Sequence, residues 1–474
     1  MEKNFKQVKM ICTLGPASES KEIMSQLVDA GMNVTRFNFS HGDHAEQGGR
    51  MQTIREINEE KGTNVALLLD TKGPEIRTHL FEGKKVTVED GSTVKVHMSE
   101  ITGSATEFSV SYPGLIDDVE VGGTILVDDG YLELKVIEKQ DGVIVTKAMN
   151  THMIKDRRGI NVPNAKLNMP FISEKDRADI IFGAEQKVDF IAASFVRRAD
   201  DVLAIREILK EHGGENIQII AKIENQEGVA NAEEILEVAD GIMVARGDLG
   251  VEVPAEEVPV IQKRLIRQCN EAGKIVVTAT QMLESMQDNP RPTRAEVSDV
   301  ANAVYDGTDA IMLSGESAAG TYPVRSVQMM ADIARRIQSE IDHEEMVNRA
   351  IFSSPHTVGS AIGISVADSA YDLGAKTIVA ATISGKTARE LSKYRPVAPI
   401  IAATPKPETA RALALNWGVH PVVVKETATT DELIQVAKEV ADKEVGLESG
   451  DVAIITAGLP VGEGKTNLMK IHVK

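Results

Sequence analysis

The sequence predicts an α/β protein: a (β/α)8 TIM barrel, an all-β lid domain inserted after the third barrel strand, and a C-terminal three-layer α/β domain. Three observations lead to this fold class. Eight short apolar runs alternate with amphipathic segments of helix length, a series of strands and turns interrupts the third repeat, and a second α/β pattern follows the eighth. The chain has 474 residues, which is enough for several domains.

The predicted barrel strands are nearly continuous apolar runs, which is typical of parallel strands covered on both faces. They are Val8–Thr13, Asn33–Phe39, Val65–Thr71, Phe190–Val196, Gln218–Glu224, Gly241–Ala245, Ile275–Thr280 and Ala310–Ser314. Helices are predicted between them at Ser20–Ala30, Ala199–His212, Asn231–Val238, Val258–Ala272 and Glu296–Tyr305. These segments assign residues 1–74 and 172–341 to the barrel, which is close to the usual size of about 250 residues.

Residues 75–171 have a different pattern, with short strands separated by turns and glycines. The predicted strands are Lys85–Val88, Val94–His97, Thr106–Val110, Thr124–Val127, Leu132–Val136 and Val143–Lys147. The insertion begins at the C-terminal end of a barrel strand, where the active sites of such barrels lie. We therefore expect a lid that closes over the substrate.

Residues 342–474 return to alternating strands and helices, which predicts a separate α/β domain. Its predicted strands are Lys376–Ala381, Pro399–Ala403, Val419–Val424, Asp451–Thr456 and Met469–Val473. Helices are predicted at Thr387–Lys393 and Thr430–Lys443.

Composition excludes several classes of partner. The formal net charge of −19 argues against nucleic acid or an anionic membrane surface as the main partner. The sequence has no apolar stretch of about 18 residues or more that would predict a membrane span. Cys12 and Cys269 are too few for a disulfide framework, so we expect both to be small buried hydrophobic residues. We expect a cytoplasmic protein.

Polar residues gather where the predicted barrel strands end. These clusters are Arg36–His41 at the end of the second strand, Asp70–Arg77 at the end of the third, Lys222–Asn225 at the fifth, Arg246–Asp248 after the sixth, Thr280–Gln281 at the seventh and Ser314–Glu316 at the eighth. The carboxyl ends of parallel barrel strands meet at one mouth, so we expect a single site there.

The residue types at this mouth favour phosphoryl transfer. Glu224 and Asp248 are hard oxygen ligands on adjacent strands and suit one Mg²⁺ or Mn²⁺ ion. Positive charge for a phosphorylated substrate comes from Arg36, Arg77, Lys222 and Arg246. Each residue alone also fits a structural role: Lys222 and Glu224 as an ion pair, Asp248 in a turn, and Thr280 as an ordinary strand residue.

Seven segments closely resemble the pyruvate kinase family, and the resemblance covers essentially the whole chain. They are Cys12–Ser18, Arg36–Gly42, Leu69–Arg77, Ala221–Asn225, Met243–Gly250, Ala279–Met286 and Met312–Glu316. The resemblance implies transfer of the phosphoryl group of phosphoenolpyruvate to ADP, which gives pyruvate and ATP. It also implies a homotetramer, of the type without the extra C-terminal domain of some bacterial relatives.

The resemblance assigns roles at the barrel mouth. Lys222 is expected to stabilise the moving phosphoryl group, Arg36 to bridge the phosphate, and Thr280 to belong to the relay that protonates the enolate. The catalytic set is Lys222, Arg36, Thr280 and Arg77, and the substrate-binding set adds Ala245, Arg246, Gly247 and Asp248. Glu224 and Asp248 are expected to hold the divalent metal.

A monovalent-cation site and a nucleotide site are also implied. The expected K⁺ ligands are Asn38, Ser40, Asp70 and Thr71, and Glu75 matches the acidic residue of K⁺-dependent members. The expected nucleotide contacts are Asn38, His41, Arg77 and Arg158, with Asp129 as the lid residue that reaches in on closure.

The C-terminal domain resembles the family's sugar-phosphate effector site at Thr382, Ser384, Gly385, Lys386 and Thr387, with Gly458–Thr466 as a second effector loop. Helix Thr387–Lys393 would offer its N-terminal amides to a phosphate. Plain turns with helix caps are the alternative interpretation of both loops. Fructose 1,6-bisphosphate, a sugar monophosphate and AMP all stay open as the effector.

Two other functions are alternatives to this one. A metal-dependent aldolase of 2-oxo acids would use the same two carboxylates but would need neither the K⁺ cluster nor the lid. A non-enzymatic metabolite sensor would keep the C-terminal site and lose the barrel chemistry. The presence of Lys222, Glu224, Asp248 and Thr280 together argues against the sensor.

Overall fold

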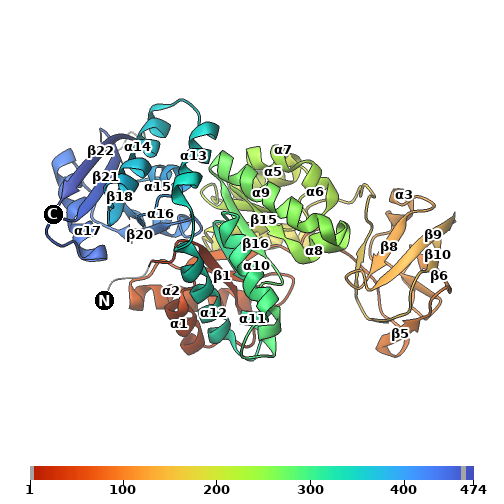
Figure 1. Cartoon of the computed structure of the whole chain (residues 1–474). Helices are drawn as coiled ribbons and strands as arrows, with labels where there is room; N and C mark the ends of the chain where they lie inside the picture. The colour runs from red at the N-terminus through yellow and green to blue at the C-terminus, as the bar shows by residue number, and fades with distance from the viewer. Residues whose placement is uncertain (1–4, 461–465) are drawn as a thin grey trace.

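A computed structural model describes residues 5–460 and 466–474. Figure 1 shows the parts of the chain in a row, with the lid domain in orange at one end, the barrel in the middle and the C-terminal domain in blue at the other end. The lid therefore meets the barrel far from the C-terminal domain. Within the described part of the chain, no helix is long and apolar enough to cross a membrane.

The central sheet closes on itself as a parallel barrel in the order β1-β17-β16-β15-β14-β13-β3-β2. Its strands are β1 (Lys9–Thr13), β2 (Val34–Asn38), β3 (Ala66–Asp70), β13 (Phe190–Ala193), β14 (Gln218–Ile223), β15 (Gly241–Ala245), β16 (Ile275–Ala279) and β17 (Ala310–Leu313). The eight predicted strands are confirmed. The largest boundary error is at β13, which ends three residues before the predicted Val196.

Helices cover the outside of the barrel, and several begin at a side chain that caps their free amides. Ser20, Asp43 and Ser173 each accept a hydrogen bond from a first-turn amide, and Thr293 forms a capping box with Glu296. The helices are α1 (Lys21–Ala30), α2 (His44–Lys61), α4 (Glu174–Glu185), α5 (Ala199–Glu211), α6 (Gln226–Ala230), α7 (Ala232–Val238), α8 (Arg246–Glu252), α9 (Val258–Ala272), α10 (Arg294–Tyr305), α11 (Gly315–Ala318) and α12 (Pro323–Gln338).

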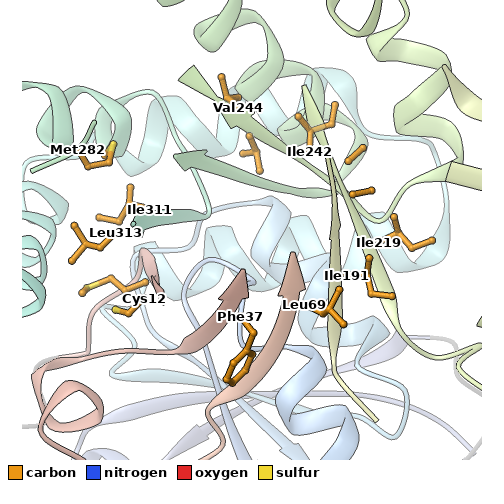
Figure 2. Packing of buried hydrophobic residues seen from close by; sticks show 14 of the residues in the cluster. Cys12, Phe37, Leu69, Ile191, Ile219, Ile242, Val244, Met282, Ile311 and Leu313 are labelled. Carbon is orange, nitrogen blue, oxygen red and sulfur yellow. The ribbon is translucent and has the colours of Figure 1, made fainter. Parts of the chain in front are cut away.

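Alternate residues of the strands build two separate cores, as expected when neighbouring side chains point to opposite faces. Ile11, Leu68 and Met243 belong to the cluster that fills the barrel. The outward-facing residues pack against the helices, and Figure 2 shows Cys12, Phe37, Leu69, Ile191, Ile219, Ile242, Val244, Met282, Ile311 and Leu313 of this layer. Cys12 and Cys269 are both free and buried, as predicted, and burial raises the pKa of Cys12 to about 12.

The lid is a mixed sheet with its own hydrophobic core. Its main sheet has the order β4-β12-β8-β9-β10-β6-β7, and β11 pairs with β5 beside it. The strands are β4 (Ile76–Arg77), β5 (Lys85–Val88), β6 (Thr93–His97), β7 (Glu107–Ser109), β8 (Thr124–Val127), β9 (Leu132–Gln140), β10 (Val143–Ala148), β11 (His152–Lys155) and β12 (Gly159–Asn161), with the short helix α3 (Leu115–Asp118). The sequence pattern did not indicate β4, β11 or β12. With two and three residues, β4 and β12 are too short for a recognisable alternation.

The C-terminal domain is a sheet between helices, in the order β20-β19-β18-β21-β22 with β22 antiparallel. The strands are β18 (Thr377–Ala381), β19 (Ile400–Thr404), β20 (Val419–Val423), β21 (Val452–Gly458) and β22 (Thr466–Val473). The helices are α13 (His343–Ser353), α14 (Val358–Asp372), α15 (Lys386–Lys393), α16 (Pro407–Ala412) and α17 (Thr430–Val445). One core holds α14 and α15 against the sheet and another holds α17 against it, which confirms the predicted three layers.

This domain docks on the N-terminal end of the barrel. Ala414 and Leu415, which follow α16, belong to the same cluster as the residues that fill the barrel, so they close its floor. Lys9 at the start of β1 is buried and donates a hydrogen bond to the carbonyl of Val419. Arg411 pairs with Asp189, 3.0 Å from Nε to Oδ1. The opposite end of the barrel stays open toward the lid.

Candidate active site

Asp70 lies at the centre of the barrel mouth, at the end of β3, between two cations. Its Oδ2 is 2.6 Å from Nε of Arg36 on β2, and its Oδ1 is 3.2 Å from Nζ of Lys222 on β14. Burial by itself raises the pKa of Asp70, but Arg36 and Lys222 outweigh it and hold that pKa below its ordinary value. The carboxylate is therefore charged and orients both cations.

Lys222 is held on several sides. Its Nζ lies 2.9 Å from Oε1 of Glu224 and donates a hydrogen bond of 2.8 Å to Oγ of Ser194. Burial lowers the pKa of Lys222, yet Asp70 and Glu224 raise it above its ordinary value. A charged ammonium is thus fixed at the mouth of the barrel, where burial away from water strengthens its field.

Ser194 is a site residue to which the sequence analysis assigned no role. Its hydroxyl contacts Lys222, the Thr71 carbonyl at 2.7 Å and Asp70 Oδ1 at 3.1 Å. The residue falls inside the predicted fourth strand, at the end where the other strands carry their polar residues. That position was the signal that could have identified it.

Glu224 and Asp248 fit a divalent cation by the chemistry of their donors. Glu224 is buried directly after β14, and Asp248 lies in the first turn of α8. Burial, together with the nearby charge of Asp248, raises the pKa of Glu224 to about 7, although Lys222 opposes the shift. Two carboxylates whose charges repel each other in this way suit a bound cation. Within residues 5–460 and 466–474, no group of three or more His, Cys, Asp or Glu residues could hold a metal ion, so other oxygens must complete this coordination.

The predicted K⁺ ligands come from two adjacent strands. Asn38 ends β2 directly opposite Asp70 in the β2–β3 register, and its Oδ1 accepts a 3.0 Å hydrogen bond from the Ser40 amide. Thr71 follows Asp70, and its Oγ1 accepts from the Ser194 amide at 3.1 Å. The structure thus brings four oxygen-bearing residues to one edge of the mouth.

Thr280 lies on the opposite side of the barrel mouth and has an unusual backbone conformation. It follows β16 with φ of 67°, and Gln281 has φ of 53°. A β-branched residue in this left-handed region costs about 1–3 kcal/mol and persists where its surroundings hold it. The Gly247 amide donates to Thr280 Oγ1 at 2.7 Å, and Arg246 Nη2 donates to the Thr280 carbonyl at 2.7 Å.

The same chain order and geometry occur in known proteins. Residues 5–327 match the family model "Pyruvate kinase, barrel domain", and residues 360–472 match "Pyruvate kinase, alpha/beta domain". The chain belongs to the pyruvate kinase family. It is therefore a phosphotransferase of glycolysis on a TIM-barrel fold.

Individual pyruvate kinases are similar over nearly the full chain. The protein of Geobacillus stearothermophilus is 56% identical over 471 residues, which are 99% of this chain and 80% of that relative. The protein of Staphylococcus saprophyticus is 54% identical with the same coverage. The crystal structure of a pyruvate kinase from Cryptosporidium parvum has a TM-score of 0.94 and 44% identity, and covers 99% of this chain and 96% of that one.

The expected nucleotide residues of a pyruvate kinase come from two domains: Asn38 and His41 from the end of β2 on the barrel, and Arg77 and Arg158 from the lid. Glu75 and Arg77 form a two-point ion pair, with distances of 2.6 and 2.8 Å. Arg158 Nε is 3.5 Å from Asp128 Oδ1 on the lid. His41 is exposed beside the end of β2.

Asp129 of the lid is close enough to the barrel to sense its charge. Partial burial, together with the charges of Asp128 and Asp248, raises the pKa of Asp129. Glu75, Asp129 and Asp248 share the wall of a cavity of about 490 Å³ between lid and barrel. The lid therefore brings a carboxylate toward the predicted metal ligands.

Four of the five expected effector residues of the pyruvate kinase family, Thr382, Ser384, Lys386 and Thr387, line a separate pocket of about 200 Å³ in the C-terminal domain. Gly385, with φ of 82°, donates its amide to Thr382 Oγ1 at 3.0 Å and starts the turn into α15. Thr387 Oγ1 is 2.9 Å from Thr466 Oγ1 on β22. Of the predicted second loop, Gly458–Thr466, residues 461–465 lie outside the described residues.

Proposed function

We propose that this chain transfers the phosphoryl group of phosphoenolpyruvate to ADP and releases pyruvate and ATP. One observation carries the proposal: the Lys222 ammonium is buried at the barrel mouth and fixed between Asp70 and Glu224. A moving phosphoryl group spreads negative charge over its oxygens, and a fixed cation stabilises that charge without reorganisation.

Arg36 and Lys222 together receive the phosphoryl group in this proposal. Arg36 is already oriented by Asp70 and by Thr13, whose Oγ1 accepts from Nη1 at 2.9 Å. Its planar group binds phosphate oxygens in two-point geometry. The backbone of Ala245 and Gly247 binds the substrate carboxylate, and Thr280 contributes to protonation of the enolate.

Two cations complete the proposed site. Glu224 and Asp248 would hold Mg²⁺ or Mn²⁺, while Asn38, Ser40, Asp70 and Thr71 would hold K⁺. Bound there, these ions neutralise phosphate charge during transfer. The donor sets support both assignments, because every side chain named offers an oxygen.

The nucleotide lies between lid and barrel in this proposal. Asn38, His41, Arg77 and Arg158 contact ADP, and residues 75–171 act as the lid. Closure brings Asp129 toward Asp248 and excludes water, which protects the phosphoryl group from hydrolysis.

Regulation belongs to the C-terminal domain in this proposal. Thr382, Ser384, Gly385, Lys386 and Thr387 bind the phosphate of an effector, and the turn at Gly385 that presents the N-terminal amides of α15 supports this assignment. The effector is fructose 1,6-bisphosphate, a sugar monophosphate or AMP. The family resemblance further supports a homotetramer that works in the cytoplasm.

The direct test is pyruvate formation from phosphoenolpyruvate and ADP with Mg²⁺, comparing K⁺ with Na⁺ and adding the three effectors one at a time. Turnover that requires K⁺ is expected, since Glu75 matches the residue of K⁺-dependent members. Absence of turnover under every condition, with folded protein, would contradict the proposal and favour the sensor or the aldolase.

A further inference from the structure

The guanidinium of Arg246 does not face the phosphate-binding cations but holds the turn that carries Thr280. Nη2 donates to the Thr280 carbonyl at 2.7 Å, and Nε donates to the Ala279 carbonyl at 3.3 Å. Nη1 forms an ion pair of 2.6 Å with Asp299 on α10. Only a tenth of the Arg246 side chain is exposed, so these contacts are made largely out of water.

Thr280 needs such support because its backbone is in the left-handed region, at φ of 67°. The end of β16 turns sharply there, and the following Gln281 has φ of 53°. Arg246 Nη2 also lies 3.5 Å from the Gln281 carbonyl, so one side chain spans the whole turn. Gly247, next to Arg246, donates its amide to Thr280 Oγ1 at 2.7 Å. The Thr280 hydroxyl itself donates to the Ala279 carbonyl at 2.6 Å. Its position is therefore set from α8 on one side and from the end of β16 on the other.

We propose that Arg246, locked by Asp299, is a positioning residue for Thr280 and serves the protonation step rather than phosphoryl transfer. This inference rests on the proposed function and deepens it. Substrate contact at this segment is then left to the backbone of Ala245 and Gly247. Asp299 has no assigned role in the sequence analysis, and its function here is to keep Nη1 occupied so that Nη2 and Nε point at the turn.

The chemistry explains why the position of Thr280 matters for one step. After phosphoryl transfer, the enolate becomes pyruvate when the C2–C3 electron pair forms a new C3–H bond and the oxygen forms the C2 carbonyl. The proton comes from solvent water through the Thr280 hydroxyl, which leaves hydroxide in solvent. A displacement of a reacting group by about 1 Å can cost up to 100-fold in rate, whereas Lys222 and Arg36 are on other strands and stay in place.

The test measures phosphoryl transfer and protonation separately in the variant Arg246→Lys. The lysine ammonium cannot contact Asp299 and the turn at the same time. Phosphoryl transfer is measured as ATP formed in a single turnover with saturating phosphoenolpyruvate and ADP. Protonation is measured by NMR as exchange of the pyruvate methyl protons in D₂O, with Mg²⁺, K⁺ and ATP present. The exchange rate should fall about 10- to 100-fold, with ATP formation reduced less than about threefold. Asp299→Asn should give the same pattern more weakly.

Arg206→Lys is a matched control. Arg206 also binds a backbone carbonyl, that of Val238 at 2.8 Å, and an aspartate, Asp240 at 2.7 Å, but it lies on α5 away from Thr280. Arg206→Lys should leave the ratio of methyl-proton exchange to ATP formation unchanged.

Equal losses of exchange and ATP formation in both Arg246→Lys and Asp299→Asn would overturn the inference, as would unchanged exchange in both. If Arg246→Lys does not fold, the same two rates measured in Asp299→Asn test the inference. A wild-type protein that forms no ATP would contradict the proposed function itself, and the inference would fall with it. Loss confined to exchange establishes the positioning role.

Discussion

Asp309, just before β17, and Arg395, just after α15, form a buried ion pair of 2.8 Å that joins the barrel to the C-terminal domain. The same Oδ1 accepts a hydrogen bond of 3.2 Å from the Trp417 amide, and Oδ2 accepts one of 2.9 Å from the Val276 amide. The side chains of Asp309 and Arg395 are only 4% and 6% exposed. One carboxylate therefore links two barrel strands to the domain that is expected to bind the effector.

Replacement of Asp309 by alanine should destabilise the protein strongly. It leaves the Arg395 charge buried without this partner, which costs about 3–5 kcal/mol. The measurement is chemical unfolding with wild type and variant side by side. Asp332→Ala is the control, because Asp332 is exposed and its pair with the partly exposed Arg335 should contribute less than about 1 kcal/mol. Equal losses of unfolding free energy in Asp309→Ala and Asp332→Ala would contradict this prediction.

Lys222→Met should lower kcat by at least about 1,000-fold, because the ammonium acts mainly on charge that develops in the transition state. Asp70 keeps Arg36 as a partner and Glu224 keeps the Phe195 amide, which donates to its Oε2 at 2.5 Å, so the fold should be retained. Steady-state kinetics and circular dichroism check the two parts of the prediction. A kcat near that of wild type would exclude Lys222 from the transfer step.

Lys9 should make stability depend on pH in the alkaline range. Burial lowers its pKa from 10.5 to about 7 in the folded protein. Between these two values the unfolded chain binds more protons than the folded one, so the free energy of unfolding should rise with pH, by up to about 1.4 kcal/mol per pH unit. Lys9→Met should reduce this rise but leave the part that Lys6 contributes, because burial also lowers the pKa of Lys6. Lys210→Met, on the exposed face of α5, should keep the full rise. Unfolding measured at several pH values between about 7 and 9 tests the difference. An identical slope in wild type and Lys9→Met would refute it.

Ser384→Glu should abolish activation by a phosphorylated effector, because the new carboxylate repels the phosphate at the start of α15. Activity without effector should stay near that of wild type, since the effector pocket lies in the C-terminal domain and the candidate active site in the barrel. Activation curves for each candidate effector provide the measurement. Gln435→Glu adds the same charge at an exposed position of α17 and should leave activation intact. Normal activation of Ser384→Glu would move the effector site elsewhere.

The barrel and most of its candidate site could be predicted because their signals are local. A buried parallel strand must be apolar along its whole length, and all strands of the barrel point the same way. Polar residues at their carboxyl ends, such as Asp70 and Glu224, therefore had to meet at one mouth. Short lid strands such as β4 carry too few residues for this kind of argument.

The sequence by itself determined the barrel strands, the order of the domains and the residue types at the mouth, because burial and strand period act on neighbours in the chain. Tertiary structure alone decided which partners those residues have. Ser194 meets Lys222 across 28 positions, Arg246 meets Asp299 across 53, and Arg395 meets Asp309 across 86. Such contacts depend on how strands and helices pack in space, where a hydrogen bond is decided by fractions of an ångström. For this reason the pattern of charges suggested Arg246 as a substrate-binding residue, whereas in the structure its guanidinium donates hydrogen bonds to the turn that carries Thr280.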